Sequence, residues 1–90
     1  MEYLKFTNKN QQLIEEGKKK CTSRNKPSLD PRIKIQYIRP LWYVAENLYK
    51  DEGYDSPSDF IRVWKSLHRG HYKPEKEVFV YYGNFREANK

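Results

Sequence analysis

Apolar and polar residues alternate in two stretches of the chain, which predicts half-buried β-strands because successive side chains of a strand point to opposite faces. In the stretch from Ile33 to Pro40, the alternation assigns Tyr37 to the core-facing side, and the proline closes the strand. A run of consecutive apolar residues predicts a strand near the C-terminus, and a basic stretch after the first glycine is expected to be extended. The predicted strands are 3–6, 18–24, 33–40 and 77–82.

Capping and turn residues predict the first of three helices. Asn8 is expected to be its N-cap and Gln11 the capping-box partner three residues later. The helix should run through Glu16 and end at Gly17, because a glycine just after a helix adopts the left-handed conformation without steric cost. A second, short helix is predicted at 41–50, where apolar residues are spaced by three and four.

The clearest local signal in the chain is the start of the third predicted helix. Ser56 is suited to the N-cap, a proline follows at the first helical position, and Asp59 completes a capping box. The helix should end at Gly70. Its apolar face carries Phe60 and Trp64, which we assign to the core.

The order of these elements indicates an α+β fold. Strands and helices do not alternate regularly, so a repeated βαβ array is not expected. The segment 25–32, with two prolines, is predicted to be an irregular loop. We therefore expect one domain over residues 1–90, built as a small mixed sheet or partly closed β-barrel flanked by helices.

Length and composition exclude several classes of protein. A chain of 90 residues has room for one modest core, and its mean hydropathy of −1.11 with no apolar run near 18 residues excludes a membrane span. The N-terminal residues lack the apolar stretch of a signal peptide, so a cytoplasmic location is expected. Cys21 is the only cysteine and cannot form an internal disulfide, in agreement with a reducing compartment. We expect it to be a small core residue.

The net charge of +6 is concentrated in one segment. Between Lys18 and Arg39 there are eight basic residues and one acid, a net charge of +7, whereas the other 68 residues sum to −1. Such a segment is typical of a surface that binds phosphate or another polyanion. The alternative is a solvated face without a partner.

The basic segment opens with the pattern G-x-K-x-x-T-x-R, formed by Gly17, Lys19, Thr22 and Arg24. In a strand, Thr22 and Arg24 lie on one face and can line a cleft. Lys19 has the opposite parity and joins them only if the backbone bends near Lys20. Without a cleft, this pattern is an exposed basic strand.

Together with Glu52, Gly53 and Tyr54, an acidic Ser-Pro helix start, a tryptophan-bearing helix and a terminal apolar strand, this motif resembles the ASCH family. The resemblance covers about residues 4–85. ASCH domains are similar to PUA domains, a small β-barrel class associated with RNA. The resemblance implies a PUA-like mixed barrel or strongly curved sheet of about four to five strands with two to three flanking helices.

The chain departs from the family pattern between its arginine and its central strand. Members usually have a Gly-Asp turn and a further strand there, but this chain has Leu29, Asp30 and Pro31 and little room. A missing strand would leave an exposed sheet edge. A homodimer would cover that edge.

The resemblance also implies a candidate enzyme activity. Some bacterial ASCH proteins are amidohydrolases that remove the acyl group of N4-acylated cytidine with a lysine, a threonine and a glutamate. The motif positions are Lys19, Thr22 and Glu52. A threonine becomes a nucleophile when a base takes its proton, and a lysine can act as that base when burial or neighbouring cations lower its pKa. Glu52 would protonate the leaving amine, and Arg24 would hold a phosphate or an oxyanion.

Binding of RNA, single-stranded nucleic acid or a nucleotide is the function we favour from the sequence, because it needs only basic groups and aromatic platforms. Trp42 and Tyr43, next to Pro40, are the expected exposed pair. The predicted ligand-binding residues are Lys18, Lys19, Lys20, Thr22, Arg24, Lys26, Arg39, Trp42, Tyr43 and Glu52.

Other chemistry has little support in the sequence. A protein-interaction module without a nucleic-acid role is a further alternative, since ASCH-like domains also occur in coactivator proteins. His68 and His71 lack a nearby cysteine or carboxylate cluster, so no metal is expected, and no cofactor is expected. The four glycines are dispersed, which excludes a P-loop.

Overall fold

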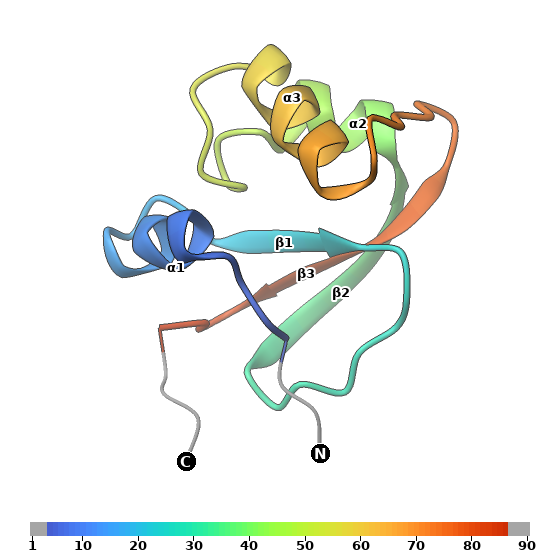
Figure 1. The fold of residues 1–90 in the computed structure, drawn as a ribbon. Coiled ribbons are helices and arrows are strands. Elements are labelled where there is room, and N and C mark those ends of the chain that lie inside the picture. Colours follow the sequence, from blue (N-terminus) through green and yellow to red (C-terminus); the bar gives the residue numbers. More distant parts are fainter. Residues whose placement is uncertain (1–3, 87–90) are drawn as a thin grey trace.

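Three antiparallel strands form the sheet within residues 4–86, the part of the chain that the computed structural model describes. The strand order is β1-β3-β2, so the last strand in sequence lies at the centre (Figure 1). The elements are α1 (Asn8–Glu15), β1 (Cys21–Arg24), β2 (Ile33–Pro40), α2 (Leu41–Asn47), α3 (Pro57–Leu67) and β3 (Glu77–Gly83).

The central strand is the most apolar one because both of its faces are covered. Val78 and Val80 lie in a core formed with α2 and α3 on one face of the sheet. Tyr81 lies on the other face, in a second core with Ile14 of α1 and Phe85. The run of apolar residues in this strand therefore reflects burial on two sides rather than one.

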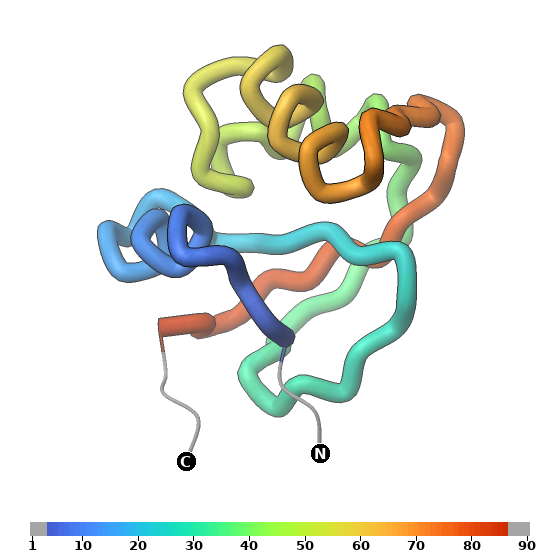
Figure 2. Tube along the Cα trace, in the orientation of Figure 1, coloured from blue at the N-terminus to red at the C-terminus, as the bar shows by residue number. Residues whose placement is uncertain are grey.

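The chain segments before α1 and after β3 belong to the second core. The rings of Phe6 and Phe85 are 5.5 Å apart between centroids. In Figure 2 both segments lie below α1. This packing seats the residues before α1 next to β1.

The helix starts lie at or within one residue of the predicted capping signals, whereas two helices end early: α2 ends at Asn47 rather than 50, and α3 ends at Leu67, before Gly70. Ser56 accepts a hydrogen bond from the backbone N of Asp59 at 3.2 Å, which confirms the predicted start of α3. The predicted N-cap of α1 was wrong by one residue, because Thr7 has the extended backbone and accepts from Asn10. Gly17, with φ of +76°, ends α1 as predicted.

The expected four- to five-stranded mixed barrel is wrong for residues 4–86: the sheet has three strands, is purely antiparallel and does not close. Residues 4–6 do not join it, and the predicted residue 3 lies outside the described part. Side chains take the place of a neighbouring strand for the backbone hydrogen bonds of Leu4: its N–H donates to Asp30, and its carbonyl accepts from Arg32. The strand expected over 18–24 begins only at Cys21.

The assignment of Tyr37 to the core was also wrong. β2 is an edge strand, and its middle is exposed: Tyr37 is 39% exposed, and Ile35 and Ile38 are 49% and 48% exposed. Alternation predicted the strand correctly, but neither face of its middle is buried, since residues 34–38 are all exposed. Cys21, Phe60 and Trp64 are buried in the core, as predicted.

Candidate functional site

A cleft of about 1250 Å³ opens between β1, α3 and the segment before α1. Its walls come from five separate parts of the chain, including the loop after β1 and the connection between α2 and α3. Half of the predicted binding residues line this cleft: Lys19, Thr22, Arg24, Lys26 and Glu52. Lys19 and Glu52 are 33 positions apart in the sequence, so only the fold brings this set together.

Lys19 and Glu52 form an ion pair at the floor of the cleft. Lys19 Nζ donates to Glu52 Oε1 at 2.8 Å and to the Glu52 carbonyl at 3.1 Å. Both residues are buried, with exposed fractions of 6% and 3%. Because buried charges are costly unless paired, each side chain is held in place by the other.

The backbone next to this pair explains how distant residues meet. The carbonyl of Asp51 accepts from the N–H of Lys20 at 2.6 Å and of Cys21 at 3.0 Å. The α2–α3 connection is thereby fastened to the start of β1, as the approach of the two segments in Figure 2 shows. Lys19 therefore enters the cleft from the residues just before β1, which begins at Cys21.

Ser23 completes the buried network, and the sequence analysis did not select it. Its Oγ donates to Glu52 Oε2 at 2.5 Å, so both carboxylate oxygens have a donor. Ser23 shares its strand parity with Lys19, and this shared parity was the signal in the sequence that could have assigned Ser23 to the same site. Every buried side-chain nitrogen or oxygen within residues 4–86 has a hydrogen-bond partner.

Gly53 and Tyr54 follow the glutamate and shape the same floor. Gly53 has φ of +99°, and a Cβ there would lie 3.2 Å from both Leu13 Cδ1 and Lys19 Cβ. Tyr54 donates to Asn10 Oδ1 at 2.9 Å, and Lys19 Nζ lies 5.7 Å from its ring centroid. Burial, with a smaller effect from the Glu52 charge, raises the pKa of Tyr54 to about 12.

Thr22 and Arg24 form a second polar group on the cleft wall. Arg24 Nε donates to Thr22 Oγ1 at 3.2 Å, and Arg24 Nη2 donates to the Lys5 carbonyl at 2.9 Å. The guanidinium carbon lies 5.0 Å from the Phe6 ring centroid. Burial lowers the pKa of Arg24. Arg24 thus holds the segment before α1 against β1 while facing the cleft.

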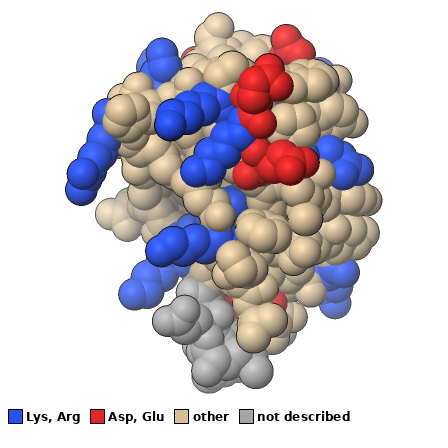
Figure 3. Space-filling view, turned by 90° about the vertical axis from the view of Figure 1, so that its right-hand side faces the viewer, with Lys and Arg blue, Asp and Glu red and all other residues tan. Residues whose placement is uncertain are grey.

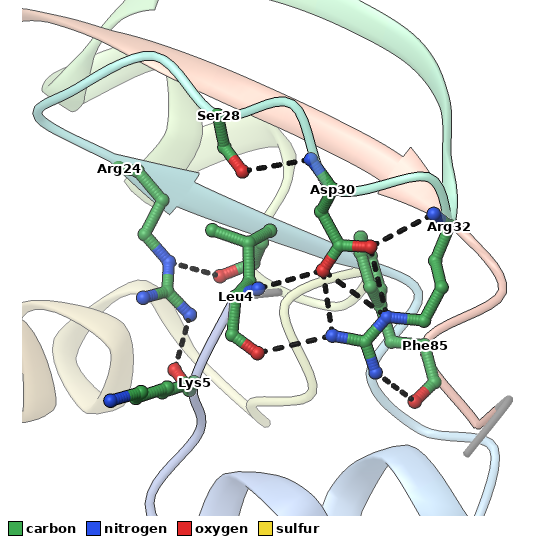
Figure 4. Close-up of polar contacts among 8 residues, drawn as sticks. Leu4, Lys5, Arg24, Ser28, Asp30, Arg32 and Phe85 are labelled. Atoms are coloured by element: carbon green, nitrogen blue, oxygen red, sulfur yellow. Dashed lines mark hydrogen bonds and ion pairs between the residues drawn. The ribbon is translucent and has the colours of Figure 1, made fainter. Parts of the chain in front are cut away.

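Asp30 and Arg32 are a second buried ion pair, visible beside Arg24 in Figure 4. Arg32 Nη2 donates to Asp30 Oδ2 at 2.7 Å, and the same guanidinium reaches the carbonyls of Leu4 and Phe85. Burial raises the pKa of Asp30, but hydrogen bonds and the charge of Arg32 outweigh it, so the net pKa is lowered. This pair belongs to the fold, and its arginine adds nothing to an exposed basic surface.

Five predicted binding residues do not line the cleft. Lys18 is exposed and pairs with Glu16 at 3.5 Å, and Lys20 is exposed as well. Arg39 lies at the β2–α2 junction, with its guanidinium 4.9 Å from the Tyr37 ring and 5.9 Å from the Tyr43 ring. Trp42 packs edge-on against Tyr43 at 5.8 Å and is 39% exposed.

The basic segment therefore does not form one continuous surface. Figure 3 shows Lys and Arg side chains spread over the visible face, with most of the visible acidic surface in the upper part of the view. Folding places Lys19, Arg24 and Lys26 at the cleft, Arg39 at the β2–α2 junction and Arg32 in the interior. The other basic residues of the segment, Lys18, Lys20 and Lys34, are exposed outside the cleft.

Aromatic residues of α3 form the opposite wall of the cleft. Phe60 and Trp64 of α3 line it together with His68, which follows the helix directly, and the three residues are spaced by four positions. The rings of Trp64 and His68 are stacked, with centroids 4.0 Å apart. The core residues that the sequence assigned to packing thus also border the candidate site.

The chain matches no protein-family model, no curated protein and no solved structure. Within residues 4–86, no three His, Cys, Asp or Glu side chains are grouped as a metal site would require. No helix of that part combines the length and apolar character needed to cross a bilayer. The similarity to ASCH domains stays a prediction that rests on the sequence motifs.

Proposed function

We propose that the cleft binds a nucleotide or a short stretch of single-stranded RNA, and that the chain is a shortened, PUA-like member of the ASCH class. The observation that carries the proposal is the meeting of Lys19, Thr22, Arg24 and Glu52 in one cleft. These are the residues that the resemblance assigns to the ligand.

The size and composition of the cleft support such a ligand. Pockets for small molecules usually measure about 300–1,000 Å³, and this cleft, at about 1250 Å³, has room for more than one ring system. Lys5 and Lys26 are exposed cations at its edge, and Tyr54 and Trp64 offer aromatic surface inside it. Cations with aromatic platforms are the usual means of holding single-stranded nucleic acid.

Salt dependence of binding tests this proposal. The affinity for a short single-stranded RNA, followed by fluorescence anisotropy, should fall with salt by a log–log slope of about −0.7 for each phosphate neutralised. Lys5→Ala together with Lys26→Ala should weaken binding and flatten the slope. Lys9→Ala with Lys34→Ala removes two exposed lysines away from the cleft and serves as the matched control. Absent or salt-insensitive binding by the unmodified chain would refute the proposal.

Hydrolysis of N4-acylated cytidine is the second candidate, favoured by the 2.8 Å contact between Lys19 and Glu52. Groups at that distance can exchange a proton. In this reaction the ion pair first passes its proton from Lys19 to Glu52, which gives a neutral amine and a carboxylic acid. Thr22 Oγ then attacks the acyl carbon and loses its proton to the Lys19 amine, and the bond to N4 breaks as the Glu52 acid protonates the leaving amine. Water then releases the acyl group from Thr22.

This second candidate has a direct assay. The chain is incubated with N4-acylated cytidine, and free cytidine is measured by chromatography. Turnover that Thr22→Ala abolishes supports the reaction. If the substrate stays intact with both the unmodified chain and Thr22→Ala, catalysis is rejected for that substrate.

A further inference from the structure

A second, smaller cavity adjoins the cleft at the C-terminal end of α3. It has a volume of about 430 Å³ and shares Asn25, Trp64, Leu67 and His68 with the cleft. Because four residues border both spaces, the two cavities are adjacent, with Trp64 and His68 at their common border. No predicted binding residue lines this cavity.

The side chains unique to the second cavity are mostly basic. It is lined by Arg69, Lys73 and Lys76 together with His71, and no Asp or Glu lines it within the described residues. Glu75 lies between the two lysines in sequence and is exposed. The cavity thus presents three fixed positive charges to an occupant, which favours an anion.

Backbone hydrogen bonds bring the two lysines of this cavity together. Lys73 and Lys76 are the ends of a turn in which the Lys76 N–H donates to the Lys73 carbonyl at 3.1 Å. The turn is anchored to α2, since Leu41 N donates to the Lys76 carbonyl at 2.8 Å and Trp42 N to the Pro74 carbonyl at 3.0 Å. The charges are therefore carried by a braced turn and not by a free loop.

Arg69 occupies an unusual backbone conformation for its residue type. Its φ is +58°, a left-handed region in which glycine or asparagine is ordinary, and Gly70 follows at +82°. The turn is closed by the Gly70 N–H, which donates to the Lys65 carbonyl at 2.7 Å. A glycine at position 69 would relieve the backbone, yet the chain has an arginine there whose side chain lines the cavity.

We propose that this second cavity is a phosphate subsite for single-stranded RNA, which takes the backbone of the nucleotide next to the one in the cleft. The inference rests on the proposed binding function and adds the path of the ligand, from the Lys19–Glu52 floor past the Trp64–His68 stack to Arg69, Lys73 and Lys76. A mononucleotide fills the cleft alone, and an oligonucleotide occupies both spaces.

A length series of ligands tests the subsite. The variant carries Arg69→Gly, Lys73→Ala and Lys76→Ala, of which the first suits the existing backbone. Binding of a uridine mononucleotide and of two-, four- and six-residue oligouridylates is measured by titration at several salt concentrations. The variant should bind the oligonucleotides at least tenfold more weakly, with a salt slope smaller by about 2, and should bind the mononucleotide as the unmodified chain does.

The control and the contrary outcomes separate the subsite from the proposed function. Lys34→Ala with Lys50→Ala removes two exposed charges that line neither cavity and should leave all affinities within twofold. If the unmodified chain binds every ligand and the triple variant is unchanged, the subsite is wrong and the cleft stands. Equal weakening for mononucleotide and oligonucleotide also rejects it. If the unmodified chain binds none, both proposals are wrong.

Discussion

Lys19 and Glu52 are joined by a 2.8 Å ion pair across 33 residues of sequence, and both are almost fully buried. This contact connects the start of the sheet to the connection between the helices that cover it. It therefore has a structural effect that is independent of any ligand. Measurements of stability and of binding are needed side by side to separate the two roles.

Removing one member of this pair should destabilise the fold strongly. Lys19→Met leaves the Glu52 carboxylate buried without its cation, and the free energy of unfolding should fall by about 3–5 kcal/mol. The double variant Lys19→Met/Glu52→Met removes both charges and should lose less than the sum of the single changes. Urea denaturation followed by circular dichroism measures all three.

The exposed pair of Lys18 and Glu16 is the control for that experiment. Lys18→Met should change the free energy of unfolding by less than about 1 kcal/mol, because solvent screens exposed ion pairs. A Lys19→Met variant as stable as Lys18→Met would contradict the proposed importance of burial.

Gly53→Ala should impair both stability and the geometry of the cleft floor. The positive φ is unfavourable for alanine, by about 1–2 kcal/mol, and the new Cβ would press on Lys19 Cβ and Leu13 Cδ1, both 3.2 Å away. Gly17→Ala is a matched control, with φ of +76° and no atom within 4 Å of the added Cβ. Thermal unfolding and RNA affinity should therefore separate the variants: both lose stability, and Gly53→Ala alone loses affinity.

The Asp30–Arg32 pair makes stability depend on pH in the acid range. Because the folded pKa of Asp30 is lowered, its contribution is fully present above the ordinary aspartate pKa of about 4. It is lost as the pH falls below that value toward the lowered pKa. Urea midpoints between pH 7 and pH 2.5 should fall less steeply for Asp30→Asn, which starts less stable, than for the unmodified chain.

Asp59→Asn gives the reference for the acid experiment, because Asp59 pairs with Arg62 on the exposed surface of α3. It should keep the pH dependence of the unmodified chain. A slope for Asp30→Asn equal to that of Asp59→Asn would contradict the assigned role of the buried pair.

The thiol of Cys21 should react only when the fold opens. It has no exposed surface, and burial raises its pKa, so the thiolate is suppressed in the folded state. Labelling with a disulfide reagent at pH 8 should be slow in buffer and fast in urea. Rapid labelling in buffer would show that β1 separates from the core far below the global unfolding free energy.

The uncovered edge of the sheet makes a homodimer a testable prediction. β2 is an edge strand with exposed Ile35, Tyr37 and Ile38, and such edges pair readily with other strands. If two copies associate there, Ile38→Lys should shift the mass in light scattering from dimer to monomer. If light scattering shows that the unmodified chain is a monomer at high concentration, the homodimer is excluded.

Local signals in the sequence were enough for much of the secondary structure. The cap at Ser56 and the stop at Gly17 depend on backbone groups within four residues, so they could be predicted without knowledge of the fold. The strand at Leu4 failed because its partner groups, Asp30 and Arg32, are more than 25 residues away. A side-chain network replaced the ladder that alternation had indicated.

The candidate site could likewise be predicted only in part from the sequence. The motif identified Lys19, Thr22, Arg24 and Glu52 as residue types suited to a polar site, and all four line one cleft. Ser23 was missed because its role depends on which way Glu52 approaches β1. The second basic cavity was missed because acids elsewhere in the sequence cancel its charge in any sum along the chain.

By itself the sequence determined the α+β class, the cap at Ser56, the helix stop at Gly17, the apolar last strand and the excess of positive charge, since each arises from neighbouring residues. Only the tertiary structure decided that Lys19 meets Glu52, that β2 is an open edge, and that the basic residues divide among separate places. Those outcomes depend on long-range packing and on the desolvation of charges, which depend on distance in space and not on separation along the chain.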